Sequence, residues 1–155
     1  MHLDHKRRGF ITGLASLSVI TTVPAAGAQA TEAPIAPPLR PGRSAFLARA
    51  FALRDAAVRA GDQAYGAVVV KDGKIVGQGP SRVVTNTDAT AHAEMEAIRD
   101  ASRRLGTRDL SGCILYSSSA PCAMCETAAY WAGIAKKVHG AEGTDSGAPR
   151  YGGCR

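Results

Sequence analysis

The feature that most constrains this chain is a pair of short segments rich in metal-ligand side chains. The first contains His92 and Glu94, and the second contains Cys122 and Cys125 directly after Pro121. Histidine and cysteine bind zinc, and three such ligands leave the fourth tetrahedral position open. Pro121 suits the first turn of a helix, where the two cysteines lie on one face and the positive helix end favours thiolate. We therefore predict that His92, Cys122 and Cys125 bind zinc and that Glu94, beside them, is the catalytic proton carrier.

Two other interpretations of the cysteines stay open from the sequence alone. Cys122 and Cys125 could form a disulfide, or a fourth protein ligand could close the zinc site and make it structural. Cys113 stands at the start of an expected strand and Cys154 at the end of the chain, so neither has the spacing of a fourth ligand. We favour the open site, and whether Cys113 and Cys154 are free or bonded stays undecided.

Residues 1–30 have the pattern of an export signal. Lys6-Arg7-Arg8 precedes a mildly apolar run over residues 10–23, and Ala28-Gln29-Ala30 supplies the small residues that a signal peptidase needs. We expect cleavage near Ala30 and a periplasmic protein, and the arginine pair resembles the twin-arginine signal that carries folded proteins. Part of the formal charge of +6 belongs to this signal, so the basic composition does not predict nucleic-acid binding. No apolar run is long enough to predict a membrane anchor.

The rest of the sequence predicts one α/β domain over residues 43–155, after a proline-rich leader over residues 31–42. Asp72-Gly73 predicts a hairpin turn between two short apolar runs. Helices and strands then alternate, which predicts a layered sandwich with a partly parallel sheet. The expected helices span residues 44–61, 91–105 and 121–133, and the expected strands span residues 66–70, 75–77, 114–117 and 137–140. The second helix is expected to bury Met95, Ile98 and Leu105.

Residues 65–140 resemble the cytidine deaminase-like superfamily. The resemblance rests on the hairpin Gly66–Gly73, on Asp88–Glu94, and on Pro121–Cys125 with the following Tyr130-Trp131-Ala132. His-x-Glu followed by Pro-Cys-x-x-Cys is a zinc deaminase signature. Within the superfamily the chain is similar to the guanine and purine nucleoside deaminase branch, which is related to the transfer-RNA adenosine deaminases.

The resemblance implies a three-layer α/β/α sandwich with a mixed sheet of about five strands. It implies one zinc ion per subunit, a homodimer, and hydrolytic release of ammonia from a purine base or nucleoside, guanine or guanosine in particular. A cytosine or cytidine deaminase is one alternative, and an inactive zinc-stabilised binding domain is another. Because export would separate the protein from transfer RNA, we expect a small-molecule substrate and no nucleic acid.

The chain departs from the family pattern at several positions. Ser81 stands where the family has a ring-binding Asn, Ala120 stands where a Glu commonly precedes Pro-Cys, and Ala89 replaces a usual Pro. Beyond the last expected strand the domain is expected to be shorter than its relatives at the C-terminus. The departures at Ser81 and Ala120 and this short end keep the inactive binding domain open. The candidate substrate contacts are Tyr65, Ser81, Ala93, Trp131 and Asp145.

Overall fold

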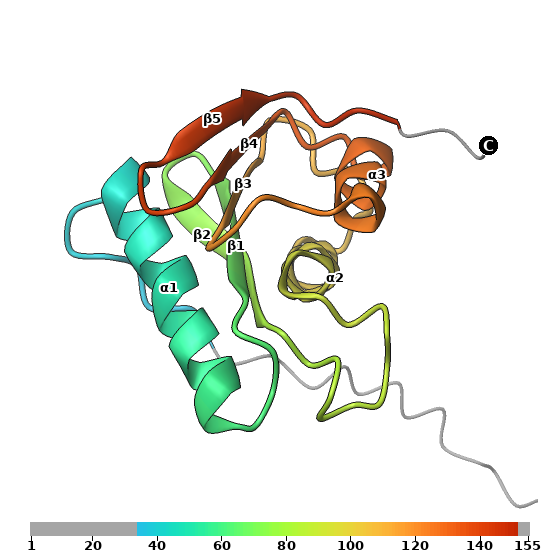
Figure 1. Cartoon of the computed structure of the whole chain (residues 1–155). Helices are drawn as coiled ribbons and strands as arrows, with labels where there is room; N and C mark the ends of the chain where they lie inside the picture. The colour runs from blue at the N-terminus through green and yellow to red at the C-terminus, as the bar shows by residue number, and fades with distance from the viewer. Residues whose placement is uncertain (1–33, 152–155) are drawn as a thin grey trace, which may run out of the picture. The chain divides into compact units, whose positions relative to one another are not determined.

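The computed structural model describes residues 34–151, so the predicted export signal and Cys154 lie outside the described residues. The elements, in chain order, are α1 (Arg43–Arg59), β1 (Gly66–Lys71), β2 (Lys74–Pro80), α2 (Ala93–Leu105), β3 (Ile114–Ser117), α3 (Ala123–Trp131), β4 (Lys136–His139) and β5 (Thr144–Gly147) (Figure 1). No helix among the described residues is long and apolar enough to cross a membrane.

The strands form one mixed sheet in the order β2-β1-β3-β4-β5. β1 pairs antiparallel with both β2 and β3, β3 pairs parallel with β4, and β4 pairs antiparallel with β5. α3 connects the parallel pair, as a crossover between parallel strands requires. The predicted mixed five-stranded sheet is therefore confirmed.

Helices cover both faces of this sheet, with α1 on one face and α2 and α3 on the other (Figure 1). Alternation along β1 sends Val68 and Val70 toward α1, and Ala67 and Val69 toward α2. The α1 side also contains Phe46, Leu47, Leu53, Tyr116 and Val138, and the α2 side contains Ala97, Ile98, Ala101, Leu115 and Ala129. Two separate buried clusters define the predicted three-layer α/β/α sandwich.

α2 packs unusually close to β2 because two residues of that strand have no side chain. A Cβ atom at Gly77 would lie 2.5 Å from the backbone N of Ala101, and one at Gly79 would lie 2.5 Å from Cβ of Glu96. Asp100 of α2 also reaches the strand, where its Oδ2 accepts the backbone N–H of Gln78 at 2.9 Å. These contacts fix the position of α2, and with it the segment that begins the helix.

The structure differs from the sequence-based expectation at several element boundaries, β2 for example spanning Lys74–Pro80 rather than 75–77, and in one additional strand. α2 begins at Ala93 rather than Ala91, and it buries Ala93, Glu94, Ala97 and Asp100 together with Ile98, whereas Leu105 is exposed. α3 begins at Ala123, because Cys122 has an extended backbone and serves as the N-cap. β5, over Thr144–Gly147, was not expected from the residue pattern, since Thr-Asp-Ser-Gly has little strand propensity.

Candidate metal centre and active site

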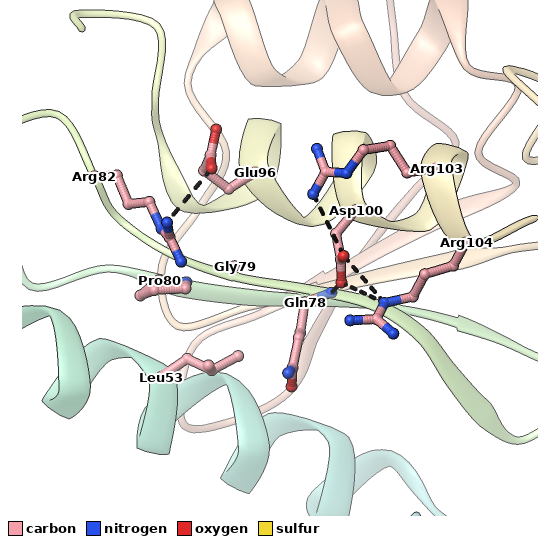
Figure 2. Close-up of a pocket in the computed structure, with 9 residues that line it drawn as sticks. All are labelled: Leu53, Gln78, Gly79, Pro80, Arg82, Glu96, Asp100, Arg103 and Arg104. Atoms are coloured by element: carbon pink, nitrogen blue, oxygen red, sulfur yellow. Dashed lines mark hydrogen bonds and ion pairs between the residues drawn. The ribbon is translucent and has the colours of Figure 1, made fainter. Parts of the chain in front are cut away.

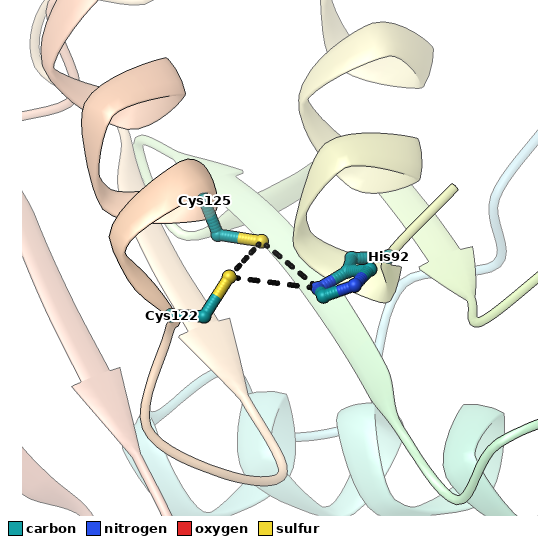
Figure 3. A group of neighbouring side chains, drawn as sticks. All are labelled: His92, Cys122 and Cys125. Atoms are coloured by element: carbon teal, nitrogen blue, oxygen red, sulfur yellow. Dashed lines mark hydrogen bonds between the residues drawn. The ribbon is translucent and has the colours of Figure 1, made fainter. Parts of the chain in front are cut away.

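The predicted metal ligands lie at the N-termini of two neighbouring helices. His92 is the N-cap residue of α2, Cys122 is the N-cap residue of α3, and Cys125 lies in the first turn of α3. None of the side chains caps its helix, so each is free to point into the space between the two helix ends (Figure 3). The positive ends of helices favour thiolates over thiols.

The three ligand atoms form a nearly equilateral triangle. Sγ of Cys122 lies 3.6 Å from Nδ1 of His92 and 3.7 Å from Sγ of Cys125, and Sγ of Cys125 lies 3.7 Å from the same Nδ1. Zinc bonds of about 2.3 Å to sulfur and about 2.0–2.1 Å to nitrogen give tetrahedral edges of about 3.8 Å between sulfurs and about 3.6 Å from sulfur to nitrogen. The triangle therefore has the size that a tetrahedral zinc ion requires.

The same distances decide between the alternatives left open by the sequence. A sulfur separation of 3.7 Å is far longer than the about 2.0 Å of a disulfide, and both cysteines are free. Among the described residues only His92, Cys122 and Cys125 come together as a potential metal site. Cys113 is a free thiol buried in the core and lies outside this group. Within the described part of the chain, the site has three protein ligands.

Glu94 lies beside this triangle and is shielded from water. Its side chain is buried in the first turn of α2, and its Oε2 lies 3.5 Å from Sγ of Cys125. Burial raises the pKa of Glu94, and burial also raises the pKa of the Cys125 thiol. A carboxyl with a raised pKa suits proton transfer near neutral pH, and a buried thiolate is stabilised by a nearby cation such as zinc.

Ser81 is buried, and the structure gives its hydroxyl a partner within the protein. Ser81 Oγ donates to Oδ1 of Asp62 at 2.8 Å. Oδ2 of Asp62 accepts the backbone N–H groups of Val84 at 3.0 Å and Thr85 at 2.8 Å. Asp62 thus holds the start of the loop over residues 81–90, which leads to His92. We call this group of contacts the Asp62 clasp. Sequence reasoning missed Asp62, because its partners are remote in sequence.

Two other predicted substrate contacts lie near the ligand-bearing segments. Ala93 is the first residue of α2, directly after His92, and its side chain is buried in the core. Tyr65 precedes β1, its side chain is 43% exposed, and its carbonyl oxygen accepts the backbone N–H of Ser81 at 2.9 Å. The structure thus places Tyr65 next to the Asp62 clasp.

Trp131 and Asp145 are not brought to the metal ligands. Trp131 is the last residue of α3, about 13 Å along the helix from Cys122, and its exposed ring packs on those of Tyr130 and Tyr151. Asp145 pairs with Nζ of Lys136 at 2.9 Å and, more distantly, with Arg43 of α1 at 3.8 Å. Those partners lie on the α1 side of the sheet, opposite the helices that carry the ligands.

Among the described residues, two surface hollows do not include the metal ligands. One, of about 350 Å³, runs along β2 and α2 and is lined by Pro80, Arg82, Glu96 and the ion pair between Asp100 and Arg104 (Figure 2). The other, of about 640 Å³, is lined by the C-terminal half of α1 and by Ser118 and Ser119, which precede Cys122 in the chain.

Comparison with known proteins now assigns the class. Residues 42–141 match the family described as the cytidine and deoxycytidylate deaminase zinc-binding region, and the chain belongs to this family. It is 48% identical to guanine deaminase from Bacillus subtilis over 102 residues, which is 65% of each chain. It is 40% identical to a tRNA-specific adenosine deaminase from Aquifex aeolicus over 100 residues, 64% of this chain and 66% of the relative. The chain thus spans slightly less than two thirds of these relatives.

Solved structures agree with this assignment. The crystal structure of Bacillus subtilis guanine deaminase superposes with a TM-score of 0.60 at 47% identity, over 62% of each chain. Guanine deaminase from Nitrosomonas europaea gives a TM-score of 0.63 at 28% identity, over 82% of this chain and 72% of that one. The family, its fold and its zinc-binding character are those expected from the sequence.

Proposed function

We propose that this protein is a zinc-dependent hydrolytic deaminase that releases ammonia from a purine base or nucleoside, with guanine or guanosine preferred. The observation that carries the proposal is the triangle of His92, Cys122 and Cys125 with the buried Glu94 carboxylate beside it. The preference for a purine is supported by the identity to guanine deaminase. A related structure, at 31% identity and a TM-score of 0.62, contains 2,6-diaminopurine, which is a purine bearing exocyclic amines.

The chemistry assigns a separate task to each residue. His92, Cys122 and Cys125 would hold the zinc ion, which would supply the Lewis acidity that makes water a nucleophile near neutral pH. Glu94 takes one proton from the attacking water at its carboxylate and delivers it to the ring nitrogen, and it then carries the second proton, from the hydroxyl added to the ring carbon, to the leaving amine. The carbon–nitrogen bond breaks, a carbonyl forms, and ammonia leaves. Burial of Glu94 keeps bulk water from exchanging with the proton that it carries.

Ammonia release by the zinc-loaded full chain tests the proposal across guanine, guanosine, adenosine, cytosine, cytidine and a transfer RNA. We expect release from a purine base or nucleoside. Preferential release from cytosine or cytidine would identify the alternative deaminase. No release from any substrate would favour a zinc-stabilised binding domain that has lost turnover.

Glu94→Gln tests the role of the carboxylate directly. The amide keeps the shape of the side chain but does not accept a proton, so we expect turnover to fall by at least about 10²–10⁴-fold. Zinc content, measured by atomic absorption, should stay at one ion per chain, since Glu94 is outside the ligand set. Near-normal turnover in Glu94→Gln would refute the assignment.

We further propose that the protein is exported folded to the periplasm and acts there as a homodimer. The support for export is the signal pattern of residues 1–30 together with the cysteine ligands, because thiols without metal oxidise in an oxidising compartment. Arg7→Lys with Arg8→Lys should prevent appearance of zinc-loaded protein in the periplasmic fraction. Unchanged export would contradict the proposal, and light scattering of the purified protein would measure the oligomeric state.

A further inference from the structure

We propose that Glu126 and Lys137 form a positioning pair that fixes the cysteine-bearing turn of α3 to β4 and thereby sets the affinity for zinc. The inference rests on the metal centre of the proposed function, but it concerns two residues outside the ligand set. Glu126 follows Cys125 directly in the sequence, and Lys137 lies on β4.

α3 needs such a support because little apolar surface holds it in place. The helix has nine residues, and only Cys125 and Ala129 are buried in it. Free energy from burial scales with apolar area, so these two small side chains and the partly buried Ala128 hold the helix weakly. No side chain caps the helix at Cys122. A metal site, however, needs its ligands held to within about 0.5 Å.

Lys137 supplies a directional contact from the sheet to this helix. Its neighbour Val138 packs on the α1 side, so Lys137 points to the opposite side, where its side chain is only 5% exposed. Its Nζ donates a hydrogen bond to Oε1 of Glu126, which forms a largely buried ion pair. The backbone N–H of Glu126 in turn donates to the carbonyl of Cys122 at 2.8 Å. Glu126 therefore connects the sheet to the backbone of both cysteine ligands.

The same carboxylate also holds the chain that follows β5. Oε1 of Glu126 accepts the backbone N–H of Arg150 at 3.1 Å. The ring of the next residue, Tyr151, packs on the ring of Tyr130, with the two centroids 5.7 Å apart. Glu126 and Tyr130 are one turn apart on α3, so the segment at residues 150–151 lies along the helix. Without Glu126, the buried Lys137 ammonium would lose the partner that the structure shows for it, which a protein interior tolerates poorly.

Zinc affinity of the full chain, measured by competition with a chromophoric chelator, tests this inference independently of turnover. Lys137→Met keeps the size of the side chain and removes its charge, and we expect the Kd for zinc to rise about 10–100-fold. The d–d absorption of the Co²⁺-loaded variant should also change, because the sulfur ligands shift. Lys137→Arg retains the cation and should restore most of the affinity.

The neighbouring Lys136 offers a matched control. It carries the same charge but pairs with Asp145 in a solvent-exposed contact on the other side of the sheet. Lys136→Ala should leave the Kd for zinc within about two-fold of the wild type. If Lys137→Met fails to fold, Glu126→Gln replaces it, since the amide keeps one accepting oxygen without the charge, and about a 10-fold rise in Kd is expected.

Two results would overturn the inference while leaving the proposed function intact. One is a folded Lys137→Met or Glu126→Gln protein with wild-type zinc affinity and an unchanged Co²⁺ spectrum. The other is a loss of affinity in Lys136→Ala as large as that in the Lys137 variant. A wild-type chain that binds no zinc would overturn the metal centre itself, and the proposed function with it.

Discussion

Replacing Ser81 with alanine separates a structural role for this residue from a contact with substrate. Ser81 is 2% exposed, and its hydroxyl donates to Oδ1 of Asp62 at 2.8 Å. A hydrogen bond to a charged acceptor contributes about 1.5–3 kcal/mol, and the partial exposure of Asp62 weakens it. We therefore expect Ser81→Ala to lower the free energy of unfolding by about 1–2 kcal/mol.

Urea denaturation of four proteins measures this contribution: the wild type, Ser81→Ala, Asp62→Ala and the double variant. If the two side chains act through one hydrogen bond, the double variant should be more stable than the sum of the single effects predicts, by about 1 kcal/mol. Effects that add to within about 0.5 kcal/mol would refute the reasoning. A raised KM for substrate with unchanged stability would instead assign Ser81 to the substrate pocket.

The Asp62 clasp also predicts how this contribution depends on pH. Burial acts to raise the pKa of Asp62, but the hydrogen bonds from Thr85, Ser81 and Gln63 outweigh it and hold the pKa well below its usual value. A carboxyl with a lowered folded pKa stabilises the protein above its unfolded pKa of about 3.9, and the effect disappears as the pH falls through the folded pKa. The difference in unfolding free energy between wild type and Asp62→Ala should thus be constant from about pH 7 to pH 5 and shrink below about pH 4.

Two further predictions follow from packing and metal binding. Gly79→Ala places a methyl group 2.5 Å from Cβ of Glu96 and should cost about 1–3 kcal/mol of unfolding free energy in urea denaturation. Gly42→Ala is the control, because a Cβ atom there would lie more than 4 Å from any residue beyond its chain neighbours, and equal effects of the two changes would contradict the packing argument. Removal of zinc with a chelator should lower the Tm, since metal at about 100 times its Kd stabilises a protein by about 2.7 kcal/mol. Cys122→Ser should abolish this zinc-dependent shift in scanning calorimetry, and a Tm insensitive to zinc in the wild type would argue against a metal that binds only the folded chain.

The metal site could be predicted from sequence because its chemistry is local. Cys122 and Cys125 are one helical turn apart, and few arrangements of a histidine with such a pair serve anything but a metal. The Asp62 clasp could not be predicted, since Ser81 and Thr85 are 19 and 23 residues away from Asp62, and only the fold brings them together.

The strand β5 and the buried ion pair of Lys137 could not be predicted from the sequence either, again for physical reasons. β5 consists of Thr-Asp-Ser-Gly, and it is a strand only because the free edge of β4 offers it hydrogen bonds. Lys136 and Lys137 are identical in the sequence, yet alternation along β4 exposes one and buries the other. The sequence predicts that successive side chains of a strand point to opposite faces of the sheet, but not which of the two lysines points to the buried side. The buried Lys137 and its partner Glu126 were therefore not identified.

The hydrogen bond from Gln78 N–H to Asp100 has a consequence for the behaviour of the protein at high concentration. β2 is an outer strand, and unpaired N–H and C=O groups along such a strand are a template for stacking with other chains. The Asp100 carboxylate accepts one of these N–H groups at 2.9 Å, so that donor is already paired within the chain. The opposite outer strand, β5, is four residues long and carries Asp145. Both edge strands of the sheet are thus poorly suited to pair with another chain, so the folded domain should resist fibrillar aggregation when it is concentrated for metal titrations.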